Sequence, residues 1–162
     1  MTPSTDEIAV AAGRAAFGSP LLPSGLRGLV AETIVETAPR LWRRLPPEAG
    51  PWTFAQGSRR LALCQAAALQ LGDAEPRREH AIGFDTRISL RVSESTDRAA
   101  CMIVFAFHGE GDPDFADHRN PLQWRFFLTP LQTLPPKWRI TLPAVRRHCP
   151  ELRFGELGAA LG

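Results

Sequence analysis

The sequence predicts a single α+β domain in which helices pack against a central mixed sheet of mostly antiparallel strands. Three observations support this prediction. The chain has 162 residues, enough to bury one ordinary core. Two helical patterns come first, then four to six strand-like patterns, then one or two short helices. This segregation, without a regular strand–helix alternation, is typical of α+β domains.

The N-terminal part predicts two helices separated by a break rich in glycine and proline. Over residues 6–17 apolar residues recur at helical spacing, and Thr5 or Asp6 can cap the first turn. Ser24 is expected to cap the second helix, which Pro39 ends or kinks. The apolar side of this second helix is expected to consist of Leu26, Leu29, Val30, Ile34 and Val35.

Strands are expected to start after a proline-rich loop. Residues 40–45 predict one further helical turn before that loop. Residues 52–56 and 59–64 then predict two short strands around a Gly57–Ser58 turn. Residues 66–71 fit the end of a strand or a helix, and the pattern leaves both open.

The centre of the chain predicts strands. Residues 82–92 alternate in polarity, with a shift near Asp85 that indicates a bulge. Residues 100–107 are continuously apolar, which predicts a central strand buried on both faces. Two more strands (123–129 and 138–142) and two short helices (144–149, capped by Thr141, and 154–161) are expected to follow.

Composition limits the classes of protein. Apolar residues make up 44% of the chain and charged residues 22%, which indicates a globular domain. No apolar stretch is long enough to span a membrane and the N-terminus lacks a basic start, so a cytoplasmic location with no membrane partner is expected. A net charge of +2 does not demand a nucleic-acid partner. Lys137 is the single lysine, so any mechanism that needs a lysine depends on it.

The three cysteines and one acidic loop carry side chains that could form catalytic or metal sites. Cys64, Cys101 and Cys149 lie far apart without a Cys-x-x-Cys pair, which predicts small buried core residues. The loop after residue 107 carries possible metal ligands, namely His108, Asp112, Asp114, Asp117 and His118. Their spacing does not match an EF-hand, so a solvated turn is expected there.

The tryptophans allow two interpretations. Trp124 and Trp138 stand beside arginines, and aromatic side chains among arginines can stack on bases. Because both residues fall on expected strands, core or cross-strand packing is the preferred interpretation.

Four segments together resemble one family. They are Gly28–Glu32; Trp52 followed by Arg59–Gln70; Phe84–Arg87; and Gln123–Pro130 followed by Leu134–Leu142. Their order and spacing resemble small bacterial proteins with a restriction-endonuclease-like core, of the PD-(D/E)xK superfamily. The resemblance covers residues 24–157 and implies one domain over 1–162, with 1–23 as a helical extension.

The resemblance implies a metal-dependent site that is degenerate in this chain. In the family an Asp on one strand, and an acid and a Lys two residues apart on the next, serve a Mg²⁺ ion that activates water. A helix Glu often assists, and Glu32 matches it. Thr53, Ala62 and Cys64 stand where the Asp, the acid and the Lys belong. The resemblance therefore implies that the standard metal site is missing and that activity is lost.

Three functions remain open on this basis. The first is a catalytically degenerate nuclease-fold protein that retains binding of DNA or RNA. Its candidate contacts are Arg59, Arg60, Gln65, Gln70, Lys137 and Arg139. The second is a non-catalytic protein-interaction module or a subunit of a larger assembly, which the near-zero net charge favours. The third is an active nuclease with a migrated site formed by Glu32 and Asp85, and only this one requires Mg²⁺ as cofactor. The oligomeric state is left open.

Overall fold

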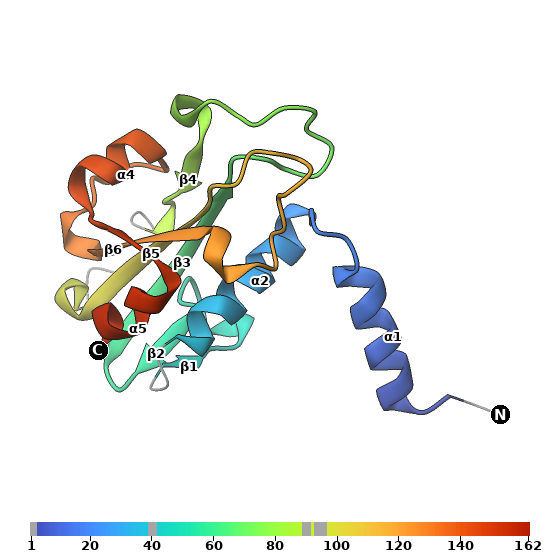
Figure 1. The fold of residues 1–162 in the computed structure, drawn as a ribbon. Helices are drawn as coiled ribbons and strands as arrows, with labels where there is room; N and C mark the ends of the chain where they lie inside the picture. The colour runs from blue at the N-terminus through green and yellow to red at the C-terminus, as the bar shows by residue number, and fades with distance from the viewer. Residues whose placement is uncertain (1–2, 39–41, 89–91, 93–96) are drawn as a thin grey trace.

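A six-stranded mixed sheet forms the centre of the protein (Figure 1). The structure is a computed structural model, and it describes residues 3–38, 42–88, 92 and 97–162. The strands, in the order in which they lie side by side, are β1 (Arg43–Arg44), β2 (Phe54–Gln56), β3 (Arg59–Ala67), β5 (Cys101–His108), β6 (Trp124–Pro130) and β8 (Glu151–Leu152). Only β3 and β5 run parallel, and the other neighbours in this sheet are antiparallel. The α+β prediction is therefore confirmed at this level.

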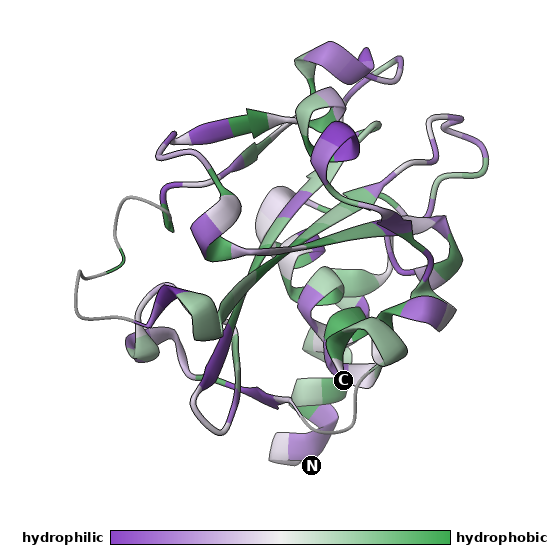
Figure 2. Ribbon diagram, turned by 90° about the vertical axis from the view of Figure 1, so that its left-hand side faces the viewer, coloured by the Kyte–Doolittle hydropathy of each residue, from purple (hydrophilic) through white to green (hydrophobic). Residues whose placement is uncertain are grey.

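The parallel pair β3 and β5 is the core of the sheet. Its register runs from Arg60 opposite Cys101 to Ala67 opposite His108. β5 is buried along almost its whole length, because its apolar run faces a packed layer on each side. The predicted central strand is thus confirmed, and Figure 2 shows the hydrophobic colouring of these strands inside the molecule.

Two different layers cover the sheet. On one face lie the helices α2 (Ser24–Thr37) and α5 (Phe154–Leu161), which pack with Leu61, Val104 and Phe126. On the other face lie the helix α4 (Leu142–His148) and a separate ribbon of β4 (Gly83–Asp85) and β7 (Arg139–Thr141), which pack with Ala62, Ile103 and Phe127. Strand side chains alternate between faces, so neighbouring residues of β3 belong to different layers.

Helix α1 (Thr5–Phe17) projects away from the rest of the chain (Figure 1). Its cap is Ser4 rather than Thr5 or Asp6: the Ser4 hydroxyl accepts from Glu7 N, and the Glu7 carboxylate accepts from Ser4 N. No residue of α1 is buried, and Ile8 is 57% exposed. The helix is therefore stabilised by its own capping and propensity rather than by packing on the sheet.

The predicted strand over residues 82–92 is wrong in its length. β4 ends at Asp85, because the Asp85 carboxylate accepts a hydrogen bond from Arg87 N at 2.9 Å and turns the chain. Ile88 is already helical, and residues 89–91 and 93–96 lie outside the described residues. The predicted bulge near Asp85 is thus the end of the strand.

Other boundaries also differ from the predictions. Arg43 and Arg44 form the edge strand β1 rather than a helical turn, and residues 40–41 of that prediction, like the helix end predicted at Pro39, lie outside the described residues. β3 continues to Ala67, which settles the first part of the undecided segment 66–71. Helix α2 has Pro23 at its N-cap position, so Ser24 is its first residue. The Leu29 side chain is 41% exposed and thus not part of the core.

No helix within the described residues has both the length and the apolar character that crossing a bilayer requires.

Candidate nucleic-acid interface

A hollow opens beside β3, beyond the point where the chain of β2 leaves this strand. Thr53 still accompanies β3: its N–H donates to Leu61 O at 2.9 Å, and its hydroxyl accepts from Leu63 N at 3.1 Å. Beyond this point lies a hollow of about 450 Å³. It is lined by Ser24, Pro51, Ala62, Leu63, Cys64, Gln65, Gly83, Asp85, Arg87 and Ile88.

Two of the three residues for which the resemblance implies degeneracy, Ala62 and Cys64, line this hollow, and neither offers an oxygen ligand for Mg²⁺. Ala62 is 2% exposed and packs in the apolar cluster beneath α4. The Cys64 thiol donates to Asp85 O at 3.0 Å. Burial, together with the nearby Asp85 charge, raises the pKa of the Cys64 thiol to about 12. Cys64 is therefore a neutral thiol at physiological pH.

Thr53, the third of these residues, has a structural role. Its hydroxyl satisfies a β3 backbone N–H that the departing strand leaves without a partner. Among the described residues, no group of three or more His, Cys, Asp or Glu side chains could hold a metal ion.

The two acids proposed for a migrated site each have an arginine beside them. On α2, Glu32 Oε2 lies 3.8 Å from Arg44 Nη1, and burial raises the pKa of Glu32 although Arg44 opposes this. On β4, the exposed Asp85 accepts from Arg87 Nε at 2.7 Å. Asp85 lines the hollow and Glu32 does not. The elements that carry them, α2 and β4, cover opposite faces of the sheet.

The two arginines at the start of β3, Arg59 and Arg60, bind neighbouring groups of the protein itself. The Arg59 guanidinium lies 5.0 Å from the centre of the Trp42 ring and donates to Gln56 Oε1 at 2.7 Å. Arg60 donates to two backbone carbonyls, Gly57 O at 2.8 Å and Arg59 O at 2.9 Å. Both side chains are half-buried at the β2–β3 hairpin, so neither reaches the hollow lined by Ala62 and Cys64.

Gln65 lines the hollow, but its amide is also bonded inside the protein. Its Oε1 accepts from Arg27 Nε at 2.6 Å, and its Nε2 donates to Ser24 O at 3.3 Å. Gln70 lies beyond the other end of β3, where its backbone N–H donates to Asp73 Oδ2 at 3.2 Å. The candidate contacts of β3 therefore do not converge on one surface.

The remaining candidates, Lys137 and Arg139, flank an exposed tryptophan. The prediction of a core position is wrong for Trp138, which is 65% exposed. It is confirmed for Trp124, which is fully buried. The backbone here is fixed by Thr86, whose hydroxyl donates to Lys137 O at 2.6 Å and whose N–H donates to Trp138 O at 2.9 Å. Lys137, Trp138 and Arg139 together are called the β7 platform below.

The β7 platform adjoins the hollow. A second depression of about 370 Å³ is lined by Gly83, Phe84, Asp85, Arg87, Trp138 and Arg139. Gly83, Asp85 and Arg87 line both this depression and the hollow beside Cys64. The Trp138 side chain and Arg139, whose Nη2 donates to Ala81 O at 2.7 Å, thus lie next to the hollow beside Cys64.

The cysteine prediction is confirmed for two of the three residues, whereas the prediction of a solvated turn after β5 is wrong for its two histidines. Cys101 and Cys149 are buried core residues, and Cys64 is half-buried. His108 and His118 are fully buried rather than exposed on a solvated turn. Their rings meet edge to face, with centroids 4.7 Å apart, and both bond backbone groups.

The sequence interpretation did not single out Arg27, which is only 3% exposed. The signal was present in its spacing, because Arg27, Ala31, Ile34 and Val35 share the buried face of α2 at helical intervals.

The structure thus has an α+β fold with a hollow beside β3 and an exposed tryptophan in the adjoining depression. No model of a known protein family matches the chain, and no curated protein matches it either.

Proposed function

We propose that this chain is a catalytically degenerate protein with a restriction-endonuclease-like core that binds nucleic acid through the β7 platform. The observation that carries this proposal is the 65% exposure of Trp138 between Lys137 and Arg139. Exposed apolar side chains that stand singly are common on protein surfaces, so the distinguishing feature of Trp138 is the cationic residue on each side of it. A tryptophan face can stack on an unpaired base, and the flanking cations can hold phosphates.

The order of elements supports the family part of the proposal. A helix, α2, precedes an antiparallel run of β1, β2 and β3, and β5 then pairs parallel to β3. The hollow lies at the point where β2 diverges from β3, next to Ala62 and Cys64. This is the place where the family resemblance puts the acid and the lysine.

Degeneracy of the catalytic positions is supported by the chemistry of their replacements. An alanine methyl group cannot bind Mg²⁺, which requires oxygen ligands. A thiol with a pKa of about 12 supplies neither a cation nor a thiolate at neutral pH. Binding without cleavage is therefore the function that these residues support.

Fluorescence anisotropy tests the proposal with labelled single-stranded and double-stranded DNA and RNA over a salt series. Single strands are expected to bind better, because stacking on Trp138 needs an unpaired base. Trp138→Ala should weaken binding about tenfold or more, as expected for the loss of one stacked base. Arg139→Gln should reduce the salt dependence by about one ion contact.

Phe115→Ala is the matched control, because Phe115 is 71% exposed on a loop outside both depressions. Equal binding by Trp138→Ala and the wild type would remove the β7 platform from the proposal. The same samples, incubated with Mg²⁺ or Mn²⁺ and run on a denaturing gel, should contain intact strands. Cleavage that is lost in Glu32→Ala or Asp85→Ala would instead favour the migrated-site alternative.

A protein-interaction module is the second candidate function, and helix α1 favours it. α1 buries no residue, and its Ile8 and Val10 are 57% and 53% exposed. A helix that projects from the domain with exposed aliphatic side chains is a suitable docking element for a partner. Absence of nucleic-acid binding at low salt, combined with an α1-dependent complex, would favour this function over the first.

A further inference from the structure

A separate hollow lies between the main sheet, helix α4 and β7. Its volume is about 620 Å³, within the range of sites that hold small molecules. It is lined by Phe105, Leu128, Thr129, Pro130, Thr133, Leu134, Pro135, Lys137, Arg139, Ile140, Thr141, Ala144, Val145, Arg147, His148 and Cys149. We call it the α4 pocket.

The floor of the α4 pocket is apolar and well ordered by packing. Phe105 and Val145 are fully buried members of the core cluster on this face, and Cys149 is 6% exposed. Leu134 and Ile140 pack against the same cluster while remaining partly accessible. A ligand in this hollow would therefore contact aliphatic and aromatic groups on rigid elements.

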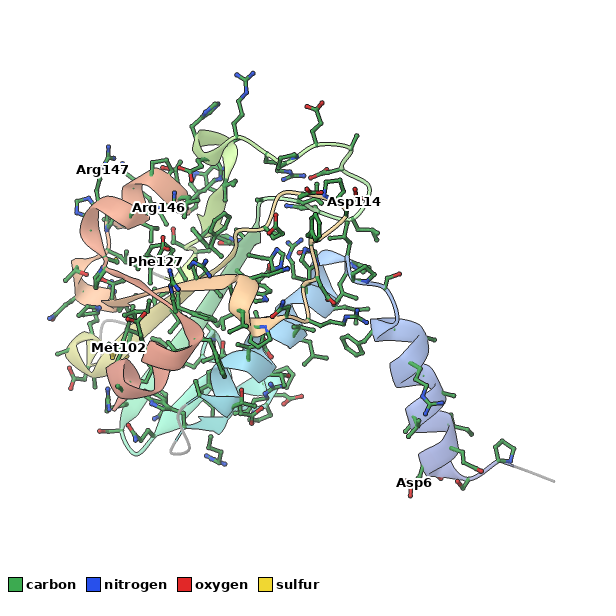
Figure 3. All side chains as sticks on the ribbon, viewed as in Figure 1. Asp6, Met102, Asp114, Phe127, Arg146 and Arg147 are labelled. Atoms are coloured by element: carbon green, nitrogen blue, oxygen red, sulfur yellow. The ribbon has the colours of Figure 1, made fainter. Side chains whose placement is uncertain are left out.

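The rim of the α4 pocket is cationic. Lys137 and Arg139 come from the β7 side, where Arg139 Nη2 also donates to Ala81 O at 2.7 Å, and Arg147 comes from the last turn of α4. Figure 3 shows Arg147 on the outer side of α4. None of the described residues that line the pocket is acidic. The rim thus offers positive charge at the mouth, where an anionic group remains partly hydrated.

The polar groups of the wall are already satisfied. The Thr133 hydroxyl donates to Pro130 O at 2.8 Å and therefore accepts from the Thr129 hydroxyl, also at 2.8 Å. These two hydroxyls are hydrogen-bonded within the turn after β6, so neither of them needs a hydrogen bond from a ligand. The chemistry that the pocket selects is consequently an apolar body with charge at one end only.

We propose that the α4 pocket binds a small amphipathic anion, whose apolar body rests on the partly accessible Leu134 and Ile140 and whose carboxylate or phosphate meets Arg139 and Arg147. The pocket volume suits an apolar body of about ten to twenty non-hydrogen atoms. This inference does not depend on the proposed function. Because Lys137 and Arg139 also belong to the β7 platform, an anion bound here competes with phosphates for those two cations.

The test uses octanoate as the probe and octan-1-ol as its uncharged counterpart, in titrations followed by amide NMR shifts and calorimetry without nucleic acid. Octanoate should bind saturably, with a dissociation constant of about 1 mM or tighter for a ligand of this size. Shifts should concentrate at Phe105, Leu128 and Val145. Octan-1-ol should bind about tenfold more weakly, because it lacks the charge that the rim attracts.

Two variants locate the site. Ala144→Phe places a ring in the pocket from α4 and should abolish octanoate binding. Arg147→Gln, at an exposed position that folding does not require, should weaken octanoate about fivefold and leave octan-1-ol unchanged. Arg147→Lys should retain the affinity, and Arg78→Gln, an exposed arginine outside the pocket, is the matched control.

Three results would overturn the inference. They are the absence of saturable octanoate binding, equal affinity for octanoate and octan-1-ol, and equal weakening by Arg147→Gln and Arg78→Gln. Because no nucleic acid is present, failure here leaves the β7 platform unaffected. Failure of the anisotropy experiment likewise leaves the α4 pocket unaffected.

Discussion

Arg27 of α2 donates a hydrogen bond from its Nε to Gln65 Oε1 at the centre of β3, at a distance of 2.6 Å. Arg27 is 3% exposed, and burial is the main reason that its pKa is lowered. Its Nη1 is buried without a hydrogen-bond partner, and no carboxylate among the described residues forms an ion pair with it. Among the described residues the Arg27 guanidinium therefore has uncharged hydrogen-bond partners only, namely the Gln65 amide and the more distant Ser24 hydroxyl.

Gln65→Glu should stabilise the protein. A carboxylate in place of the amide gives the Arg27 guanidinium a charge-assisted hydrogen bond, worth about 1 kcal/mol more than the present one. The gain is reduced by loss of the Nε2 donation to Ser24 O. Urea unfolding at pH 7 measures it, and Gln132→Glu, at an exposed position, is the control with an expected change below about 0.5 kcal/mol. A loss of stability in Gln65→Glu would contradict the need for a counter-charge.

The sequence made Gln65 a candidate contact for nucleic acid but did not reveal its hydrogen bond with Arg27. A glutamine two residues beyond Leu63 on an apolar strand indicates either a ligand contact or a surface amide. Its use as a partner of Arg27 depends on how α2 crosses β3, and this crossing is set by tertiary packing. The distinction therefore could not come from the local pattern.

Strands with strong local patterns were predictable, whereas strands created by tertiary pairing were not. The continuous apolar run over 100–107 and the Gly57 turn were sufficient to predict β5 and the β2–β3 hairpin. By contrast, β1 and β8 have two residues each and exist only because they pair with Phe54, Ala55, Phe126 and Phe127. Two residues carry no detectable period.

Lys137 and Arg139 of the β7 platform were candidates from the sequence, but the exposure of Trp138 was not predicted, because exposure cannot be read from residue type. Trp138 follows Pro135, Pro136 and Lys137, and a tryptophan at a strand start is usually buried. Here the partner strand is the short β4, and the ribbon contains only three residue pairs. No further strand covers the Trp138 side chain, so it remains accessible.

His118 makes the stability of the protein pH-dependent. Its Nδ1 accepts from Leu22 N at 2.9 Å, so the ring is neutral and donates from Nε2 to Leu69 O at 3.1 Å. Burial, together with the nearby His108 and Arg27, lowers the pKa of His118 to about 4. A histidine in the unfolded chain has a pKa of about 6.5.

The unfolded state therefore binds more protons below pH 6.5, and stability must fall as the pH is lowered. The contribution of His118 is complete above pH 6.5 and is lost down to about pH 4, with a total of about 3 kcal/mol. Urea unfolding between pH 4 and pH 8 should show this loss. His118→Asn keeps an acceptor for Leu22 N and should flatten the curve, although His108, whose pKa is also lowered, leaves some slope. His80→Asn, at an exposed position, should leave the curve unchanged.

Cys64 should resist alkylation in the folded protein. The thiolate is the reactive form, and burial beside Asp85 raises the pKa of this thiol to about 12. At pH 8 iodoacetamide should leave Cys64 unmodified for hours, as judged by mass spectrometry of peptides. In urea Cys64, Cys101 and Cys149 should all react rapidly. Fast labelling of Cys64 in the native protein would contradict the buried, neutral thiol and reopen the possibility of a nucleophile in the hollow.

Removal of residues 1–16 should leave the rest of the fold intact. No residue of α1 is buried, and the contact donated by Arg119 Nη1 to Phe17 O at 2.9 Å is retained in this truncation. The free energy of unfolding should therefore change by less than about 0.5 kcal/mol.

Light scattering of the full chain and of the truncated chain tests the second function at the same time. If Ile8 and Val10 mediate association between copies, the full chain should show a higher mass, and Ile8→Ser with Val10→Ser should abolish it without destabilisation. A loss of more than about 2 kcal/mol on truncation would show instead that α1 packs on the domain.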